Sequence, residues 1–218
     1  MTSFLITCSH ATCAIPEAHR ELFKGSEDLV TSINGWEPGS LNLAQGLAMK
    51  LSTPLIHGDV TRLLIDIDQD GERLWSEISS KLPEATRNKL IERHREKFRN
   101  TVATRLTEDF KRHDNVVHLI IQTAPITDGK ITLEYLGSSR AQEISDEAVK
   151  KLPSSEVDSS SYPLQGKTPF IEWALATHDS PKYGIIRITV SQSFFLKSIP
   201  MRWETIKKSL ITAISTAT

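Results

Sequence analysis

A three-layer α/β fold, with a mostly parallel sheet between helices on both faces, is what the sequence predicts. Short apolar runs typical of buried strands alternate with longer segments whose apolar residues recur at helical spacing. The most apolar run, Val116 to Ile121, has a length that suits a central parallel strand covered on both faces. With 218 residues, of which 39% are hydrophobic, the chain can bury the core of one domain spanning 1–218.

The individual elements follow from the same two patterns. We expect strands over 4–8, 54–56, 63–67, 116–121, 131–136 and 184–190. We expect helices over 40–50, 85–113 and 201–217, and a turn-rich loop over 33–39 that opens directly into the first of these helices. Residues 137–168 show no strong pattern apart from a short helical one near 145–151, and loops are expected there.

Charge and cysteine content narrow the class of protein. The formal net charge of -1 gives no electrostatic reason to expect nucleic acid or an anionic membrane as a partner. No stretch approaches the roughly 18 apolar residues of a membrane span, and the first apolar run is too short for a signal peptide. Cys8 and Cys13 lie near enough in sequence for a disulfide, but a reducing compartment is the simpler interpretation. We therefore expect a cytoplasmic protein.

Polar residues follow the predicted carboxyl ends of strands, where ligands bind in open α/β sheets. They are Ser9-His10, Gln122-Thr123 and Thr189 to Gln192. Taken alone, His10 is either a ligand or acid–base residue or a polar group at the start of a loop. His118 lies inside an apolar strand and is expected to be a hydrogen-bonded core histidine. The other histidines are expected on the surface or on helices: His19, His57, His94, His113 and His178.

Four segments, taken in order, carry the pattern of one enzyme family. The first runs from Leu5 through Ser9-His10 to Gly35-Trp36-Glu37-Pro38-Gly39-Ser40. The second, from Thr61-Arg62 to Asp68, is similar to a family stretch S-R-L-x-x-D-x-N-R. The third, Val117 to Pro125 with Gly129, is similar to H-L-x-x-H-S-F-x-P-x-x-x-G, and the fourth, ending at Gln192, to G-I-x-x-E-V-x-Q. In this order and spacing they resemble the N-formylglutamate amidohydrolase family over nearly the whole chain.

The resemblance implies a zinc-dependent amide hydrolase on a phosphorylase/hydrolase-like α/β fold related to zinc carboxypeptidases, acting on a small amide or carboxylate ligand. In that chemistry three protein ligands hold Zn²⁺ and leave a position for water, while a nearby Glu moves the proton. By position, His10 matches a metal-ligand His, and Glu37 matches an acidic position that is usually Asp. Arg62 matches an Arg expected near the substrate, and Asp66 matches an acidic residue that orients it.

Other matched positions depart from the family. Gln122 stands at the second His ligand, and a neutral amide oxygen is a much poorer zinc donor than imidazole. Thr189 stands at the likely general acid–base Glu and cannot do that work. Gln69 stands where the family has a carboxylate-binding Arg. The resemblance thus implies a metal site at His10, Glu37 and Gln122 with weak affinity for zinc.

Three functions stay open at this point. The first is an N-formylglutamate amidohydrolase-like amide hydrolase with an altered metal site. The second is a catalytically inactive relative that binds a small molecule or a protein. The third is a metal-dependent amidase or peptidase with other ligands, such as His57 or His118. Metal content separates the second from the others, and the choice between N-formyl and other amides separates the first from the third.

Overall fold

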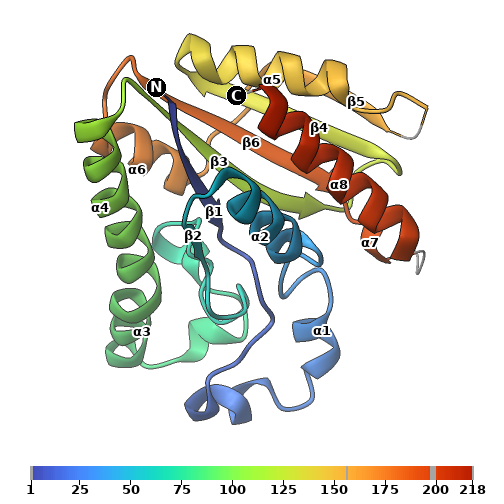
Figure 1. The fold of residues 1–218 in the computed structure, drawn as a ribbon. Helices are drawn as coiled ribbons and strands as arrows, with labels where there is room; N and C mark the ends of the chain where they lie inside the picture. The colour runs from blue at the N-terminus through green and yellow to red at the C-terminus, as the bar shows by residue number, and fades with distance from the viewer. Residues whose placement is uncertain (1, 156, 197–199, 218) are drawn as a thin grey trace.

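A six-stranded sheet forms the centre of the molecule in the computed structural model, which describes residues 2–155, 157–196 and 200–217 (Figure 1). The strands are β1 (Thr2–Cys8), β2 (Leu55–His57), β3 (Asn115–Ala124), β4 (Lys130–Gly137), β5 (Asp158–Pro163) and β6 (Tyr183–Ser191). Their order is β2-β1-β3-β6-β4-β5. All neighbours pair in parallel except β4 and β6, which are antiparallel. The predicted, mostly parallel sheet is confirmed.

Helices cover both faces of this sheet, as predicted. Helices α2 (Ser40–Leu51), α5 (Ser139–Lys151) and α8 (Pro200–Ala217) pack on one face. Helices α4 (Lys97–Arg112) and α6 (Pro169–Thr177) pack on the other. Because successive strand residues point to opposite faces, Leu119 enters the first core and Ile120 the second. The three-layer arrangement is therefore a direct consequence of strands that are apolar on both sides.

Local signals place the helix ends. The chain reaches α2 through Gly39, whose φ of 88° lies in the left-handed region that favours glycine. The side chain of Ser138 accepts a hydrogen bond from the amide of Ala141 at the start of α5. Thr168 caps α6 in the same way, and Pro169 follows in the first turn. These caps satisfy amides that would otherwise lack partners at the helix starts.

Two sequence predictions are wrong. Residues 63–67 form turns and not a strand, since the amides of Leu64 and Ile65 bond back to the carbonyl of Thr61. Leu64 and Ile65 are nevertheless buried, so the apolar run reflects core contact without a strand partner. Residues 137–168 contain β5 where a loop was expected, and α5 begins at Ser139, well before the helical pattern near 145–151. The signal was weak because β5 is a half-exposed, Ser-rich edge strand and α5 buries small residues such as Ala141.

The predicted long helix over 85–113 is present with an irregular centre. It consists of α3 (Glu84–Leu90), a π-helical segment (Ile91–Glu96) and α4. The π-helical segment carries His94, which therefore lies on a helix as expected, although only 6% of it is exposed. Widened turns of this kind occur frequently at functional sites.

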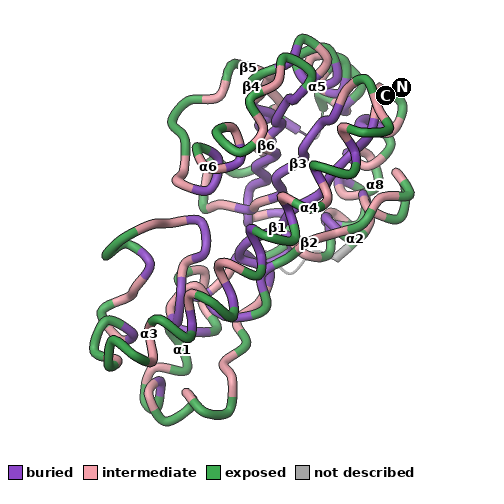
Figure 2. Tube along the Cα trace, turned by 90° about the vertical axis from the view of Figure 1, so that its left-hand side faces the viewer, coloured by how far each residue is buried: buried purple, intermediate pink, exposed green. Residues whose placement is uncertain are grey.

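Long connections extend beyond the carboxyl ends of the parallel strands (Figure 2). They contain α1 (Glu27–Thr31) and three short 3₁₀ turns, Glu17–Phe23, Gly71–Leu74 and Ser79–Lys81. A last short helix, α7 (Ser193–Leu196), follows β6. Both cysteines are free. The connections form the walls around the strand ends where polar residues were predicted to gather.

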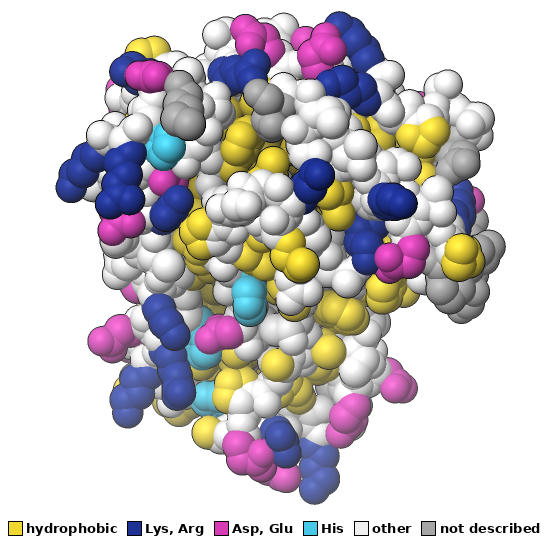
Figure 3. Space-filling view, viewed as in Figure 1, with side chains coloured by type: hydrophobic (Ala, Val, Ile, Leu, Met, Phe, Trp, Pro, Cys, Tyr) yellow, Lys and Arg dark blue, Asp and Glu magenta, His cyan; other side chains and the backbone are white. Residues whose placement is uncertain are grey.

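The surface gives two further facts. Basic and acidic side chains are interspersed on the face that Figure 3 shows. In the part of the chain that the structure describes, no helix has both the length and the apolar character needed to cross a bilayer.

The central position of β3 generates a stability prediction. Ile120 is 4% exposed, and β3 lies between β1 and β6. Ile120→Ala should lower the free energy of unfolding by about 2–5 kcal/mol, because it removes buried methylenes and leaves a cavity. Denaturant titration would measure this, with Met49→Ala as the control at an 83% exposed helix position. A loss below about 0.5 kcal/mol, the range of surface substitutions, would show that β3 is not central.

Candidate functional site

Three loops meet at the carboxyl end of β1 and bring His10, Glu37 and Asp66 together. His10 follows β1 directly, Glu37 precedes α2, and Asp66 belongs to the turns after β2. Backbone hydrogen bonds fix the first two loops, because the amide of Glu37 donates to the carbonyl of His10 at 3.0 Å. The loops that carry Thr61 and Arg62 are joined in the same way to the loops of residues 14 and 35.

His10 lies between two carboxylates. Its Nδ1 is 2.9 Å from Oε1 of Glu37, and its Nε2 is 2.8 Å from Oδ1 of Asp66. His10 and Glu37 are 8% and 7% exposed. Both ring nitrogens face carboxylate oxygens, an arrangement that favours the doubly protonated imidazolium. Burial alone would lower the pKa of His10, but the hydrogen bonds to Asp66 and Glu37 and their negative charges raise it well above its ordinary value.

The second oxygen of Glu37 is also occupied. Oε2 accepts a hydrogen bond from the amide of Thr123 at 3.2 Å, which joins the loop to the end of β3. Nη1 of Arg62 lies 3.6 Å from Oε1 of Glu37. The same guanidinium donates to the carbonyls of Asn34 at 3.0 Å and Trp36 at 3.2 Å, and to that of Ile33. Arg62, matched by sequence to a substrate-binding Arg, thus holds the loop before α2, and its role toward a ligand stays a prediction.

Gln122 and Thr189 are neighbours in the register of β3 and β6. Nε2 of Gln122 donates to Oγ1 of Thr189 at 2.6 Å. Gln122 immediately precedes Thr123, so its backbone belongs to the same end of the sheet as Glu37. Its side-chain amide is directed to Thr189, however, and the pair offers neither a charge nor a base.

Asp68 is a buried acid that the sequence did not indicate as part of the site. It is 8% exposed, and its Oδ1 has no hydrogen-bond partner in the described part of the chain. Burial raises the pKa of Asp68, and the positive charge of His10 opposes that shift. The neighbouring Gln69 also has a buried, unpartnered Oε1 among the described residues. A signal was present, since Asp68 stands where the family pattern has Asn.

These side chains do not fit a three-ligand zinc site. A zinc ligand must offer a lone pair, and an imidazole that donates through both nitrogens has none. The carboxylates of Glu37 and Asp66 lie at opposite nitrogens of the ring of His10, and not around one point. Within residues 2–155, 157–196 and 200–217, no group of three His, Cys, Asp or Glu side chains could hold a metal ion.

The two other histidines considered as ligands have different surroundings. His118 is fully buried and bonds to Oγ1 of Thr7 and to the hydroxyl of Tyr183, both at 2.8 Å. Burial lowers the pKa of His118 to about 3, so it is a neutral core histidine as predicted. His57 is exposed, and its Nδ1 lies 2.9 Å from the carbonyl of Gly58. Neither forms a hydrogen bond to His10.

Comparison with known proteins adds to this geometry. No protein-family model matches the chain, and no curated protein matches it. Among solved structures, a gene product of Agrobacterium tumefaciens is similar with a TM-score of 0.77 at 19% identity, covering 99% of this chain and 90% of that one. N-formylglutamate amidohydrolase from Ralstonia eutropha JMP134 is similar with a TM-score of 0.65 at 13% identity, covering 97% and 92%. The chain has the N-formylglutamate amidohydrolase fold.

The shared fold confirms the architecture that the resemblance implied. Both matches cover nearly all of each chain, so the amidohydrolase fold is present from end to end. Identities of 13% and 19% make this a statement about fold alone. Whether this copy of the fold keeps the chemistry depends on the side chains around His10.

His118 generates a pH-dependence prediction. The unfolded chain has an ordinary histidine pKa of 6.5, against about 3 in the folded protein. Between these values only the unfolded chain binds the proton. The contribution of neutral His118 to the free energy of unfolding is therefore complete above pH 6.5 and is lost as the pH falls toward 3. Relative to His118→Asn, the unmodified protein should lose roughly 3 kcal/mol more between pH 7 and pH 4. Parallel stability curves from denaturant titration would contradict a neutral His118.

Proposed function

We propose that the chain is a non-hydrolytic binding protein built on the N-formylglutamate amidohydrolase fold. One observation supports this most strongly: both ring nitrogens of His10 donate to carboxylates, those of Glu37 and Asp66. The histidine that would hold a metal in an enzyme of this fold lies here between one buried and one half-buried acid. Its contribution is therefore to structure, by holding the loops around the strand ends.

Gln122 and Thr189, near the carboxyl ends of β3 and β6, support the same proposal. General acid–base assistance is typically worth about 10²–10⁴-fold in rate, and it needs a group that exchanges a proton near neutral pH. Thr189 supplies only a hydroxyl, which already accepts a hydrogen bond from Gln122. The amide and the hydroxyl can instead bind a neutral or anionic ligand, which agrees with the predicted small amide or carboxylate ligand. The cytoplasmic location and the lack of nucleic-acid or membrane partners stay predictions.

A second candidate is an amide hydrolase with an altered site. The observation that favours it is the contact of 2.9 Å between His10 and Glu37, which keeps two predicted donors adjacent. The solved structure from Ralstonia eutropha also bears the name N-formylglutamate amidohydrolase. For this candidate the hydrogen bonds that hold His10 between Glu37 and Asp66, which we call the clamp, would have to break.

Formate release from N-formylglutamate, measured with zinc supplied, distinguishes the two. The unmodified protein should release no formate above the rate without protein. The combined Gln122→His and Thr189→Glu variant restores an imidazole and a carboxylate, and it should gain measurable activity if the amidohydrolase fold keeps its geometry. Thr189→Glu alone should recover little, because effects within one constellation are not additive.

A matched control introduces a histidine far from this site in sequence, in place of the one at position 122. Gln142→His on the exposed side of α5, combined with Thr189→Glu, should give no activity. Robust turnover by the unmodified protein would overturn the non-hydrolytic proposal and favour the second candidate.

A further inference from the structure

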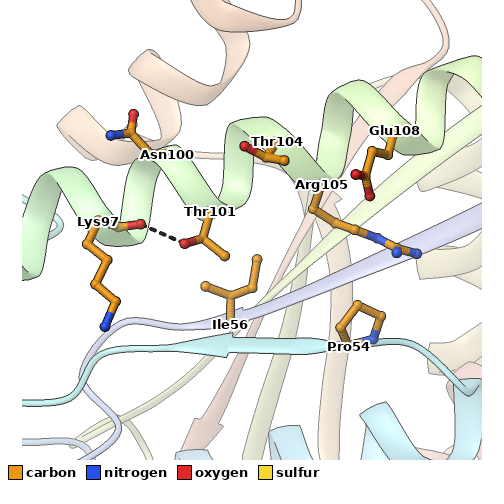
Figure 4. A pocket seen from close by; sticks show the side chains of 8 residues that line it. All are labelled: Pro54, Ile56, Lys97, Asn100, Thr101, Thr104, Arg105 and Glu108. Carbon is orange, nitrogen blue, oxygen red and sulfur yellow. Dashed lines mark hydrogen bonds between the residues drawn. The ribbon is translucent and has the colours of Figure 1, made fainter.

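A groove separates the edge strand β2 from helix α4 (Figure 4). It has a volume of about 550 Å³, with Pro54 and Ile56 on the strand side and Lys97, Thr101 and Arg105 on the helix side. A second cavity of about 300 Å³ shares Ile56, Lys97 and Thr101 with it. The two cavities thus adjoin each other, and together we call them the β2–α4 groove.

Strand β2 is the last strand at its side of the described sheet. It pairs with β1 in parallel, and the amide of Gly58 donates to the carbonyl of Cys8 at 3.0 Å. Only alternate residues of a parallel strand bond to one neighbour. Ile56 therefore faces β1 as Gly58 does, whereas Leu55 and His57 direct their N–H and C=O groups to the outer side. No described strand pairs with these groups, so another extended backbone can form hydrogen bonds to them.

The side chains that line the groove differ in polarity and charge from one end to the other. Ile56 packs partly into the core beneath α4 and provides an apolar floor next to Pro54. Arg105 is neutralised by Asp109, at 2.9 Å. Two acids also line the groove: Asp59 is paired with His94 at 2.7 Å, and Glu108 lies at the Arg105 end (Figure 4). Lys97 is exposed and reaches across the gap toward the strand (Figure 4), and it makes no ion pair among the described residues. The available positive charge thus lies at the Lys97 end.

We propose that an extended peptide segment of another protein binds in the β2–α4 groove as an added strand. Its backbone pairs with Leu55 and His57, an apolar side chain lies over Ile56, and an acidic side chain faces Lys97. Addition of a peptide strand to a sheet edge, with side-chain pockets that set specificity, is an established mode of recognition. The lining residues of α4 run from Lys97 to Glu108, about 17 Å along a helix, which some five or six extended residues at about 3.3 Å each would span.

This inference goes beyond the proposed function, because it concerns a second site and names a class of partner for it. It uses none of the side chains around His10, so formate release and peptide binding can fail independently. If the peptide does not bind and no formate is released, only the proposal of peptide binding in the groove is overturned. Formate release together with peptide binding would overturn the non-hydrolytic role alone.

The charge is tested with a fluorescein-labelled peptide of about six alternating Val and Glu residues, titrated with the full chain by fluorescence anisotropy. Lys97→Glu should weaken binding roughly threefold to tenfold, since it replaces an exposed attraction by a repulsion. The matched control, Lys111→Glu, changes an exposed lysine near the end of the same helix and should bind as the unmodified protein does. A peptide with Lys in place of Glu should bind more weakly to the unmodified protein.

The groove itself is tested with a pair of threonines on α4. Thr101 and Thr107 are both exposed, and each donates its hydroxyl to the carbonyl four residues earlier, at 2.7 and 2.8 Å. Only Thr101 lines the groove, so Thr101→Trp should abolish binding and Thr107→Trp should not. N-methylation of alternate peptide amides should also abolish it, because the added strand needs its N–H groups.

Three results would overturn the proposal: no binding of the Val-Glu peptide, equal loss in Thr101→Trp and Thr107→Trp, or unchanged affinity after N-methylation. A second copy of this chain could also pair with the edge of β2, and sedimentation of the peptide-free chain tests whether it forms a dimer. A dimer that Thr101→Trp dissociates would show that a second copy, and not another protein, covers β2.

Discussion

The imidazole of His10, held between the carboxylates of Glu37 and Asp66, is the contact on which the carboxyl end of the sheet depends. It joins the loop after β1, the loop before α2 and the turns after β2. Glu37 extends the connection to β3 through the amide of Thr123. Removing one partner of a buried ion pair typically costs about 3–5 kcal/mol, because the remaining charge is left uncompensated. Here removal of the imidazole would leave the buried carboxylate of Glu37 and the half-buried one of Asp66 without this partner.

The same contact limits the chemistry. A ring that donates from both nitrogens neutralises its neighbours and cannot also offer a lone pair to a metal. At the ends of β3 and β6, Gln122 and Thr189 form a second hydrogen-bonded pair, which is neutral where the contact of His10 with its carboxylates is charged. Hydrolases and binding proteins can share one fold, because function depends on side chains that the fold only positions. In this chain His10 is hydrogen-bonded to Glu37 and Asp66, and Gln122 to Thr189.

The sequence predicted most of the elements because strong burial leaves a strong pattern. The runs that became β1, β3 and β6 are apolar on both faces, and the stripe of α4 is regular. Patterning failed where exposure or small residues weakened it, as in β5 and α5, and where burial occurred without a strand partner, as at Leu64. Spacing in the chain cannot distinguish such a buried turn from a strand.

For the site, the sequence predicted which loops lie at the carboxyl end of the sheet. It did not predict which side chains form hydrogen bonds there. The adjacency of His10 and Glu37 followed from the family resemblance and is present. The second carboxylate on His10, the use of Arg62 by backbone carbonyls and the direction of the Gln122 side chain depend on distances between loops, to which no motif refers. The buried Asp68 is similar, since only the packing around it makes its carboxyl group unusual.

The most direct test of the clamp is nitrogen NMR of the His10 ring near pH 7, assigned by its absence in His10→Gln, without zinc and then with one equivalent of zinc. The clamp predicts two protonated ring nitrogens in both samples. Because the pKa of His10 is raised, the second proton should be lost only as the pH rises well above the ordinary histidine value. A ring that is singly protonated near pH 7, or one nitrogen that loses its proton and shifts when zinc is added, would contradict the clamp and restore His10 as a metal ligand.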